Sequence, residues 1–299
     1  MGYLGAAVLW AAALVVPGAA QAQIQAQTQA QGQGQAADAR PDNQPVKPFA
    51  IADGFWWVGA SDVAAYLLQT NKGLILIDGG YETTAPQILD NIRRLGFDPK
   101  SQVKIILNTH AHLDHAGGLA ALKAATGAKV LASGEDGKLM ARGGKGDFFL
   151  GDRAAYPPVK PDGTVRDGQK VKLGERTLTA HITPGHTRGC TTWTFPVTVD
   201  GQPRQAMILC SNTILPGYRL TGEESYPGIA ADYEKSYRAW RAMPCDIFLG
   251  SHGRFFGMAE KAKSGKPDAF VDPEGCRAYF EKGYAAFQAE LARQKTAGQ

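Results

Sequence analysis

The chain of 299 residues lacks several features that mark common protein classes. Its 32 basic and 28 acidic residues leave a formal net charge of only +4, and no run rich in lysine or arginine argues for a nucleic-acid partner. No glycine-rich motif of the kind that cradles phosphate groups is present. The longest early apolar stretch, Val8–Val16, is too short to span a bilayer, so we expect no membrane association of the mature protein.

Charged side chains are absent from the first 37 residues. Val8–Val16 is long enough for the core of a signal peptide, and Ala20-Gln21-Ala22 fits a small-x-small cleavage site. No lysine or arginine precedes this core, which departs from the usual signal-peptide pattern, and a short buried helix is the alternative. We predict a signal peptide over residues 1–22, cleaved near Ala22, and a periplasmic mature protein. A disordered linker rich in glutamine and alanine is predicted over residues 23–44.

Cysteine is scarce, with four residues in the whole chain. In an exported protein these cysteines suggest disulfides, and four cysteines allow three pairings. We favour a bond between Cys245 and Cys276, which would tie the C-terminal helix to the last strand. Cys190 and Cys210 lie on neighbouring strand patterns and form the second favoured pair, although free buried cysteines remain the alternative there.

Histidine is also scarce, yet three of the six histidines fall in one short run. His110, His112, Asp114 and His115 place four potential metal ligands within six residues, and imidazole and carboxylate donors suit zinc. Side chains two apart in an extended segment point the same way, so His110 and His112 would bind one ion. Asp114 and His115, past the bend, would face a second ion. Chance rarely places so many donor types together, which disfavours an ordinary polar loop.

The other three histidines differ in their surroundings. His186 and His252 each follow a strand pattern at a loop marked by glycine, where open α/β sheets collect ligands. Each is either a metal ligand or an ordinary histidine. His181 lies within a strand pattern, which favours a packing role.

Strand and helix patterns alternate twice along the chain, which predicts an α/β fold. The first series covers residues 45–165 and includes a helix that follows Thr83 or Thr84 and stops at Gly96. The second covers residues 166–299, with helices expected at Asp232–Met243 and Gly275–Lys295. Two such halves, packed sheet to sheet with helices outside, would form one domain over 45–299 and bring the candidate ligands to one edge.

A glycine-rich segment between the two halves, Gly143–Tyr156, carries the adjacent aromatic residues Phe148 and Phe149. One interpretation is a mobile flap whose phenylalanines contact substrate over the site. The other is an ordinary surface loop with buried phenylalanines, and the sequence leaves both open.

The pattern His110-x-His112-x-Asp114-His115, with His186 and His252, resembles the metallo-β-lactamase superfamily. The resemblance runs from about Phe49 to the C-terminal helix and implies an αββα sandwich of two mixed sheets packed face to face. Asn212 stands where other branches carry an acid that bridges two metals. This replacement, together with His115, resembles the third subclass of the class B β-lactamases.

The resemblance implies two Zn²⁺ per chain, one held by His110, His112 and His186 and the other by Asp114, His115 and His252. A zinc-bound hydroxide would open the lactam amide of penicillins, cephalosporins and carbapenems, which confers antibiotic resistance, and Asp114 would orient this nucleophile. Small-molecule β-lactams would be the only partners of a monomeric enzyme. Candidate contacts of the substrate carboxylate are Ser211, Asn212 and Thr213.

Three alternatives remain. The first is another hydrolase of the same superfamily, such as a thioesterase or a lactonase, because a shared fold does not fix a substrate. The second is a metal-free serine β-lactamase, since Ser101-Gln102-Val103-Lys104 matches one of its short motifs, but this serine precedes a strand instead of opening a helix. The third is a protein with a structural zinc site, which would be closed by four ligands.

Overall fold

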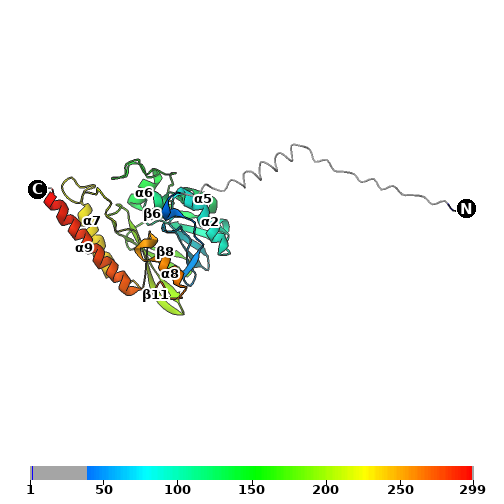
Figure 1. Cartoon of the computed structure of the whole chain (residues 1–299). Helices are drawn as coiled ribbons and strands as arrows, with labels where there is room; N and C mark the ends of the chain where they lie inside the picture. Colours follow the sequence, from blue (N-terminus) through cyan, green and yellow to red (C-terminus); the bar gives the residue numbers. More distant parts are fainter. Residues whose placement is uncertain (1, 3–38, 298–299) are drawn as a thin grey trace. The chain divides into compact units, whose positions relative to one another are not determined.

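The computed structural model describes residue 2 and residues 39–297 (Figure 1). The predicted signal peptide and most of the predicted linker lie outside these residues. The compact unit begins at Ala39, earlier than the expected start at residue 45. Asn43 explains the difference, because its buried side chain accepts a hydrogen bond from Thr84 Oγ1 at 2.5 Å and donates one to Thr83 Oγ1 at 3.0 Å. These bonds fix the segment before residue 45 to the start of the first long helix.

Two mixed sheets form the centre of this unit. The seven-stranded sheet has the order β1 to β7, antiparallel up to β4 and parallel from β4 to β7. The five-stranded sheet has the order β12-β11-β10-β9-β8 and is antiparallel except for the parallel pair β11 and β12. The strands are β1 (Phe49–Ala52), β2 (Phe55–Trp57), β3 (Tyr66–Thr70), β4 (Gly73–Ile77), β5 (Val103–Leu107), β6 (Lys129–Ser133), β7 (Gly163–Val165), β8 (Lys170–Leu173), β9 (Arg176–Ile182), β10 (Thr191–Val199), β11 (Gln202–Leu209) and β12 (Ile247–Gly250).

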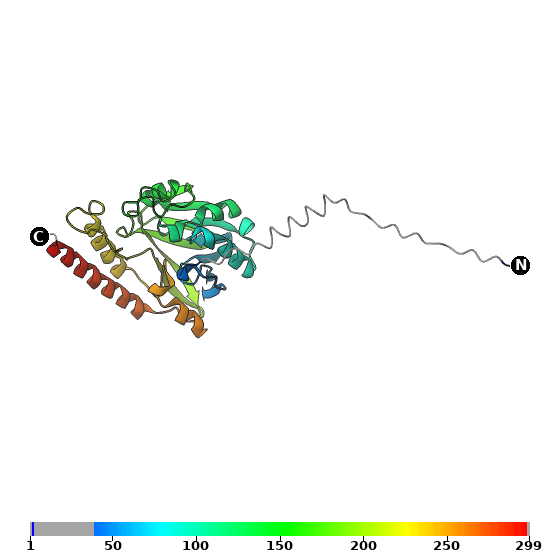
Figure 2. The same cartoon turned by 45° about the horizontal axis from the view of Figure 1, so that its top comes forward.

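Helices cover the outer faces of both sheets, with α2 and α5 on one side of the strands and α7 and α9 on the other (Figures 1 and 2). The predicted αββα sandwich is therefore confirmed, and the expected boundary between the halves falls between β7 and β8. The helices are α2 (Ala85–Arg94), α3 (Pro99–Gln102), α4 (Leu113–Ala116), α5 (Leu119–Thr126), α6 (Gly134–Ala141), α7 (Ile229–Ala242), α8 (Met258–Ser264) and α9 (Pro273–Ala297), with 3-10 turns η1 (Pro41–Asn43), η2 (Glu82–Thr84) and η3 (Gly253–Phe255).

Side-chain alternation in β4 shows that the first sheet is covered on both faces, by the second sheet and by helices. Ile75 and Ile77 join the core between the two sheets, whereas Leu74 and Leu76 join a second core against the helices. All four side chains are buried, because successive residues of a strand point to opposite faces. A strand with two buried faces reads as a continuous apolar run, which is how Gly73–Ile77 reads in the sequence.

The limits of the elements agree with the local signals. Helix α2 begins after Thr84, has Pro86 in its first turn and stops before Gly96, whose φ is +87°. Helix α9 extends beyond the predicted range at both ends. The short elements β1, β7, β8, α6 and α8 were not predicted, because three to eight residues carry too little periodicity.

Two disulfides link the pairs Cys190 with Cys210 and Cys245 with Cys276, the pairings favoured from the sequence. No free cysteine occurs in the part of the chain that the structure describes. Cys190 precedes β10 and Cys210 follows β11, so this bond crosses between two neighbouring strands. Cys245 lies just before β12, and Cys276 lies in the first turn of α9.

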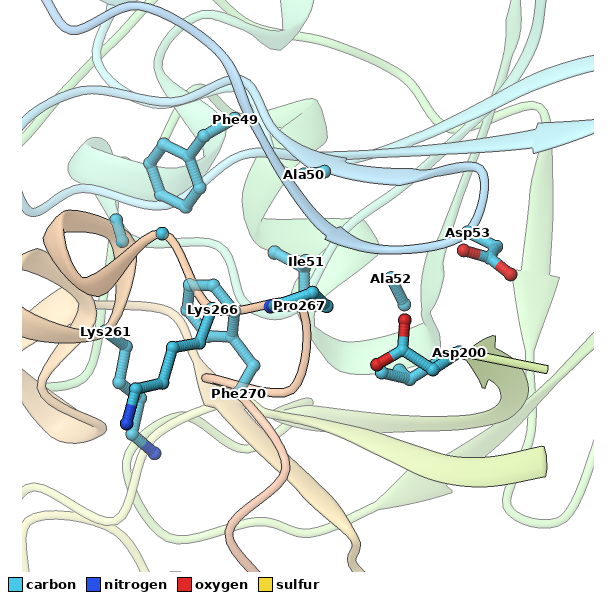
Figure 3. Close-up of a pocket in the computed structure, with 13 residues that line it drawn as sticks. Phe49, Ala50, Ile51, Ala52, Asp53, Asp200, Lys261, Lys266, Pro267 and Phe270 are labelled. Atoms are coloured by element: carbon cyan, nitrogen blue, oxygen red, sulfur yellow. The ribbon is translucent and has the colours of Figure 1, made fainter. Parts of the chain in front are cut away.

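A cavity of about 340 Å³ opens at the end of β10 remote from the candidate ligands. Figure 3 shows Phe49, Ile51 and Phe270 around it. Lys261 and Lys266 lie on one side, and Asp53 and Asp200 lie on the other. None of the residues that line this cavity is a candidate metal ligand, so the cavity is separate from the candidate site.

Within residues 39–297, no helix combines the length and the apolar character needed to cross a membrane.

The disulfides predict the result of thiol alkylation. Protein unfolded without reductant should take up no alkyl group, whereas reduced protein should take up four, as counted by mass spectrometry of the intact chain. Alkylation of two or four thiols before reduction would contradict the pairings.

Candidate metal centre

The candidate ligands come from three chain segments that each follow a strand. His110 and His112 follow β5, and the short helix α4 carries Asp114 and His115. His186 lies in the loop after β9, and His252 comes two residues after β12. The first sheet therefore supplies four candidate ligands and the second sheet supplies two.

One group of three histidines meets between the two sheets. The ligand atoms of His110, His112 and His186 all lie within 4.8 Å of one another. His112 Nδ1 lies 3.0 Å from His186 Nε2, and the three rings are buried. His186 Nδ1 lies 2.8 Å from the carbonyl oxygen of Thr213, a contact that places its proton on Nδ1 and leaves the Nε2 lone pair facing the group.

A second group adjoins the first. His110, Asp114 and His115 also have ligand atoms within 4.8 Å of one another. Asp114 Oδ2 lies 3.1 Å from His115 Nε2 and 3.3 Å from His252 Nε2, so this carboxylate stands between the two imidazoles. On the far side of the His252 ring, Nδ1 lies 3.0 Å from Asp62 Oδ2. The structure thus brings all six predicted ligands together.

Burial determines the protonation of these groups. It holds the pKa of His110 well below its ordinary value and, with the charge of His112, lowers the pKa of His186 to about 3. Burial alone would raise the pKa of Asp114, but the charge and hydrogen bond of His115 and those of His252 hold it well below its usual range. At neutral pH the imidazoles of His110 and His186 are therefore neutral and the carboxylate of Asp114 is ionised, which are the states that metal binding requires.

The donor set fits zinc. Both buried ring nitrogens of His115 make no hydrogen bond within residues 39–297, and buried polar atoms normally have a partner, which a bound cation would supply. Nitrogen and carboxylate donors without thiolate suit Zn²⁺, and three protein ligands per ion are typical of catalytic sites. The cluster is a metal site by its chemistry as well as by its geometry.

Asp136, in the first turn of α6, was not singled out in the sequence. Its buried carboxylate accepts hydrogen bonds from Ala111 N at 3.0 Å, Thr187 Oγ1 at 2.7 Å and Gly189 N at 2.9 Å. Burial is the main reason why its pKa rises to about 6. Asp136 therefore links the loop of His110 and His112 to the loop of His186. Because Asp136 comes 25 residues after Ala111, no local sequence pattern indicated that the two residues are in contact.

Asp78 plays a similar part on the other side of the first loop. Its carboxylate accepts hydrogen bonds from Asn108 Nδ2 at 3.0 Å, Thr109 N at 2.7 Å and Thr109 Oγ1 at 2.6 Å. The residue has a φ of +64°, which is unusual for a side chain with a Cβ. The Asp-Gly-Gly sequence after β4 marked this turn, but not its contact with the ligand loop.

Phe148 and Phe149 form part of an aromatic cluster beside the metal site. Their rings lie 5.3 and 4.8 Å from that of Tyr218, and Phe148 also lies 4.9 Å from Tyr226. Tyr218 Oη donates a hydrogen bond to the carbonyl oxygen of His186 at 2.8 Å. Both phenylalanines are half-buried, so the segment 143–156, called the flap below, combines features of the two interpretations left open by the sequence.

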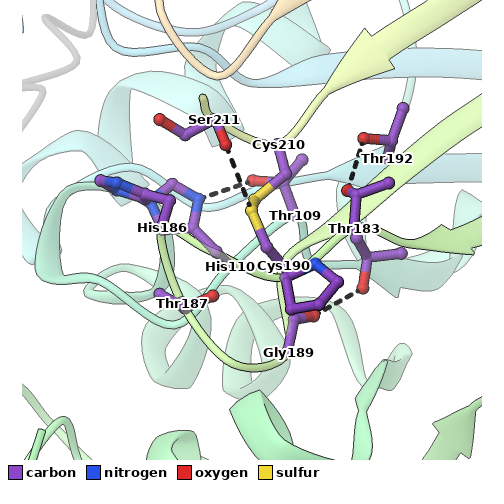
Figure 4. Close-up of a disulfide and its surroundings, with 12 residues drawn as sticks. Thr109, His110, Thr183, His186, Thr187, Gly189, Cys190, Thr192, Cys210 and Ser211 are labelled. Carbon is purple, nitrogen blue, oxygen red and sulfur yellow. Dashed lines mark hydrogen bonds between the residues drawn. A yellow bond between two sulfur atoms is a disulfide. The ribbon is translucent and has the colours of Figure 1, made fainter. Parts of the chain in front are cut away.

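Asn212, one of the predicted substrate contacts, is bound to two tyrosines. Its Nδ2 donates to Tyr237 Oη at 3.2 Å and its Oδ1 accepts from Tyr279 Oη at 2.8 Å, so the amide is held by helices α7 and α9. One N–H of Nδ2 and one lone pair of Oδ1 remain for other partners, and the role of Asn212 in substrate binding stays a prediction. Figure 4 shows Ser211, together with His110 and His186, among the side chains around the Cys190–Cys210 disulfide. Thr213 contributes its carbonyl oxygen to His186.

His181 lies apart from the six candidate ligands. Its Nε2 is 2.8 Å from Thr194 Oγ1 on the neighbouring strand, so it is a half-buried packing residue of the second sheet.

Comparisons with known proteins define the family. A sequence model described as the metallo-beta-lactamase superfamily matches residues 58–199. The FEZ-1 metallo-beta-lactamase from Legionella gormanii is 41% identical, with a TM-score of 0.83, over 86% of this chain and 100% of that one. The chain therefore belongs to the metallo-β-lactamase superfamily and is a hydrolase of that superfamily.

Further matches describe its place within the superfamily. The class B3 di-zinc metallo-beta-lactamase LRA-12, from an Alaskan soil metagenome, is 32% identical over 86% of this chain and 98% of that one, with a TM-score of 0.80. The similarity to B3 enzymes agrees with the resemblance seen in the sequence. A curated relative, the hydroxyacylglutathione hydrolase of Rhodospirillum rubrum, is 29% identical over 48% of this chain and 46% of that protein. The chain thus spans about half the length of this curated relative.

Replacement of Asp136 by alanine should destabilise the metal-free protein, because three buried donors lose their acceptor. We expect the free energy of unfolding in urea to fall by about 2–4 kcal/mol. Glu135→Ala is the matched control, since Glu135 only pairs with exposed Lys138 and should contribute less than about 1 kcal/mol. Equal effects of the two substitutions would contradict the linking role of Asp136.

Proposed function

We propose that the protein is a zinc-dependent β-lactamase that hydrolyses the lactam amide of penicillins, cephalosporins and carbapenems. The observation that carries the proposal is the pair of adjoining ligand groups, in a chain that matches FEZ-1 over the whole of that enzyme. The name of LRA-12 describes a di-zinc enzyme, which supports two ions here. Such an activity would confer resistance to β-lactam antibiotics.

The first proposed ligand set is the first group, whereas the second set takes Asp114 and His115 from the second group and adds His252, whose Nε2 lies 3.3 Å from Asp114 Oδ2. His110, His112 and His186 would hold one zinc ion, and Asp114, His115 and His252 would hold the other. Bound zinc supplies two kinds of chemistry, since it lowers the pKa of water to about 7 and polarises a carbonyl oxygen.

The protein's own side chains do the remaining work. Asp114 is ionised and lies between His115 and His252, so it is placed to accept a hydrogen bond from water and orient it toward a substrate carbonyl. Phe148 and Phe149 offer an apolar wall for the body of a small substrate beside His186. Ser211, Asn212 and Thr213 remain the proposed contacts for a substrate carboxylate.

Export to the periplasm belongs to the same proposal. The two disulfides support it, because such bonds persist in oxidising compartments. The signal peptide cleaved near Ala22 remains a prediction.

A thioesterase is the second candidate function. The match to hydroxyacylglutathione hydrolases over about half of each chain favours it. Lack of an acid at position 212, noted in the sequence, argues against it. The two functions differ in the substrate that they open, so one set of assays separates them.

Purified zinc-loaded protein should hydrolyse a chromogenic cephalosporin and a carbapenem with a kcat/KM of about 10⁴ M⁻¹ s⁻¹ or more. Treatment with a chelator should abolish turnover and added zinc should restore it, because the zinc-activated water is the proposed nucleophile. If both substrates stay intact for hours while an S-hydroxyacylglutathione thioester is cleaved, the second candidate is correct.

Asp114→Asn should lower kcat for the cephalosporin by about 100-fold, because the amide is both a weaker acceptor for the reacting water and a weaker ligand of the second zinc ion. The fold should persist, which circular dichroism and the unfolding midpoint would measure. The exposed Asp268→Asn is the control and should keep the original kcat. An unchanged kcat in Asp114→Asn would remove this residue from the mechanism.

A further inference from the structure

Asp147 is a buried acid in the otherwise glycine-rich flap, only 8% exposed. Its Oδ1 accepts hydrogen bonds from Phe149 N at 2.8 Å and Leu150 N at 2.6 Å. The backbone of Asp147 and Gly151 is joined by two further hydrogen bonds of 3.3 and 3.1 Å. Residues 147–151 are thus a closed tip whose conformation depends on this one carboxylate.

The other oxygen of Asp147 faces a proposed metal ligand. Asp147 Oδ2 lies 3.7 Å from His112 Nε2, and both atoms are buried without a hydrogen bond within residues 39–297. Two buried polar atoms that face each other unpaired are costly, and a small movement would pair them. On the opposite edge of the His112 ring, Nδ1 faces His186.

The tautomer of His112 connects these two edges. When the Nδ1 lone pair is used by a metal ion, the proton of the neutral ring must lie on Nε2. Nε2 then becomes a donor directed at Asp147 Oδ2, and a charge-assisted hydrogen bond of about 2.8 Å would form. Asp136 does not compete for this proton, because both its oxygens accept other hydrogen bonds.

The flap is incompletely packed on the side that faces α6. A cavity of about 220 Å³ separates the flap from α6, and it is lined by Gly146, Asp147 and Phe148 together with Glu135, Leu139 and Arg188. Segments with few buried contacts open at low free-energy cost. A hydrogen bond between Asp147 and His112 would therefore add a contact on the side of the flap that faces the cavity, in addition to the aromatic contacts with Tyr218 and Tyr226.

We infer that Asp147 is a positioning residue that couples metal binding at His112 to the conformation of the aromatic flap. The chain of contacts runs from the metal-side nitrogen of His112 through Asp147 to the backbone of Phe149 and Leu150. Phe148 and Phe149 are thereby held against Tyr218 next to the site. The inference rests on the metal site of the proposed function, but not on the identity of the substrate.

The test compares Asp147→Asn with Asp152→Asn. Asparagine keeps one oxygen for the flap amides but replaces the second acceptor with a donor, so it removes the bond to His112 selectively. Asp152 is the matched control, because it is an exposed acid of the same flap that accepts a hydrogen bond from Gly146 N at 2.9 Å. Circular dichroism verifies that each variant folds.

Two measurements are made on each protein. Zinc affinity, from competition with a chromogenic chelator, should fall 10- to 100-fold in Asp147→Asn, as for other partners of metal-bound histidines. Hydrogen exchange of a peptide over the flap should slow when zinc is added to the wild type and to Asp152→Asn, but not to Asp147→Asn.

Retention of either wild-type zinc affinity or zinc-dependent protection in Asp147→Asn overturns the coupling. A wild-type protein that shows the coupling but leaves β-lactams intact would contradict the proposed substrate alone. A wild-type protein that binds no zinc would contradict the metal site and this inference together.

Discussion

The candidate site depends on one buried carboxylate that holds two loops from different sheets. Asp136 accepts hydrogen bonds from the segment of His110 and His112 and from the segment of His186. Burying an anion is costly, and burial raises the pKa of this group to about 6. The three hydrogen-bond donors offset that cost, and so does the position of Asp136 in the first turn of α6, where the helix dipole favours a negative charge. This link acts together with the bonds of Asp78 to the first loop and of Tyr218 to His186, and it is the one that joins the two loops through a single side chain.

The sandwich itself makes the ligand set possible. The first sheet alone supplies His110, His112, Asp114 and His115, whereas His186 and His252 arrive only when the second sheet packs against it. Each proposed ligand group therefore contains residues from both halves. The ionised carboxylate of Asp114 and the neutral imidazoles of His110 and His186 are donors that suit a cation, so folding and metal binding should stabilise each other.

Local sequence patterns indicated the donor-rich run His110 to His115, whereas His186 and His252 were assigned only through the family resemblance, and no pattern indicated the residues that hold the ligands. His110 to His115 lie in one strand-to-loop run, and Thr84 and Gly96 mark the limits of α2, so periodicity and turn chemistry predicted both. Asp136 binds Ala111, Thr187 and Gly189, and Asp147 faces His112. These partners lie 25 or more residues away, and no local sequence pattern indicates such contacts. The contacts of Asn212 could not be predicted either, because its amide is bound by Tyr237 and Tyr279 from two helices that are distant in the sequence. The early start at Ala39 likewise depends on the contact of Asn43 with Thr84.

Anomalous diffraction from zinc-grown crystals tests the central claim most directly. The account predicts two zinc peaks per chain, one about 2.0–2.1 Å from nitrogens of His110, His112 and His186, and one beside Asp114, His115 and His252. A single ion closed by four protein ligands, or an absence of zinc among these six residues, would contradict it.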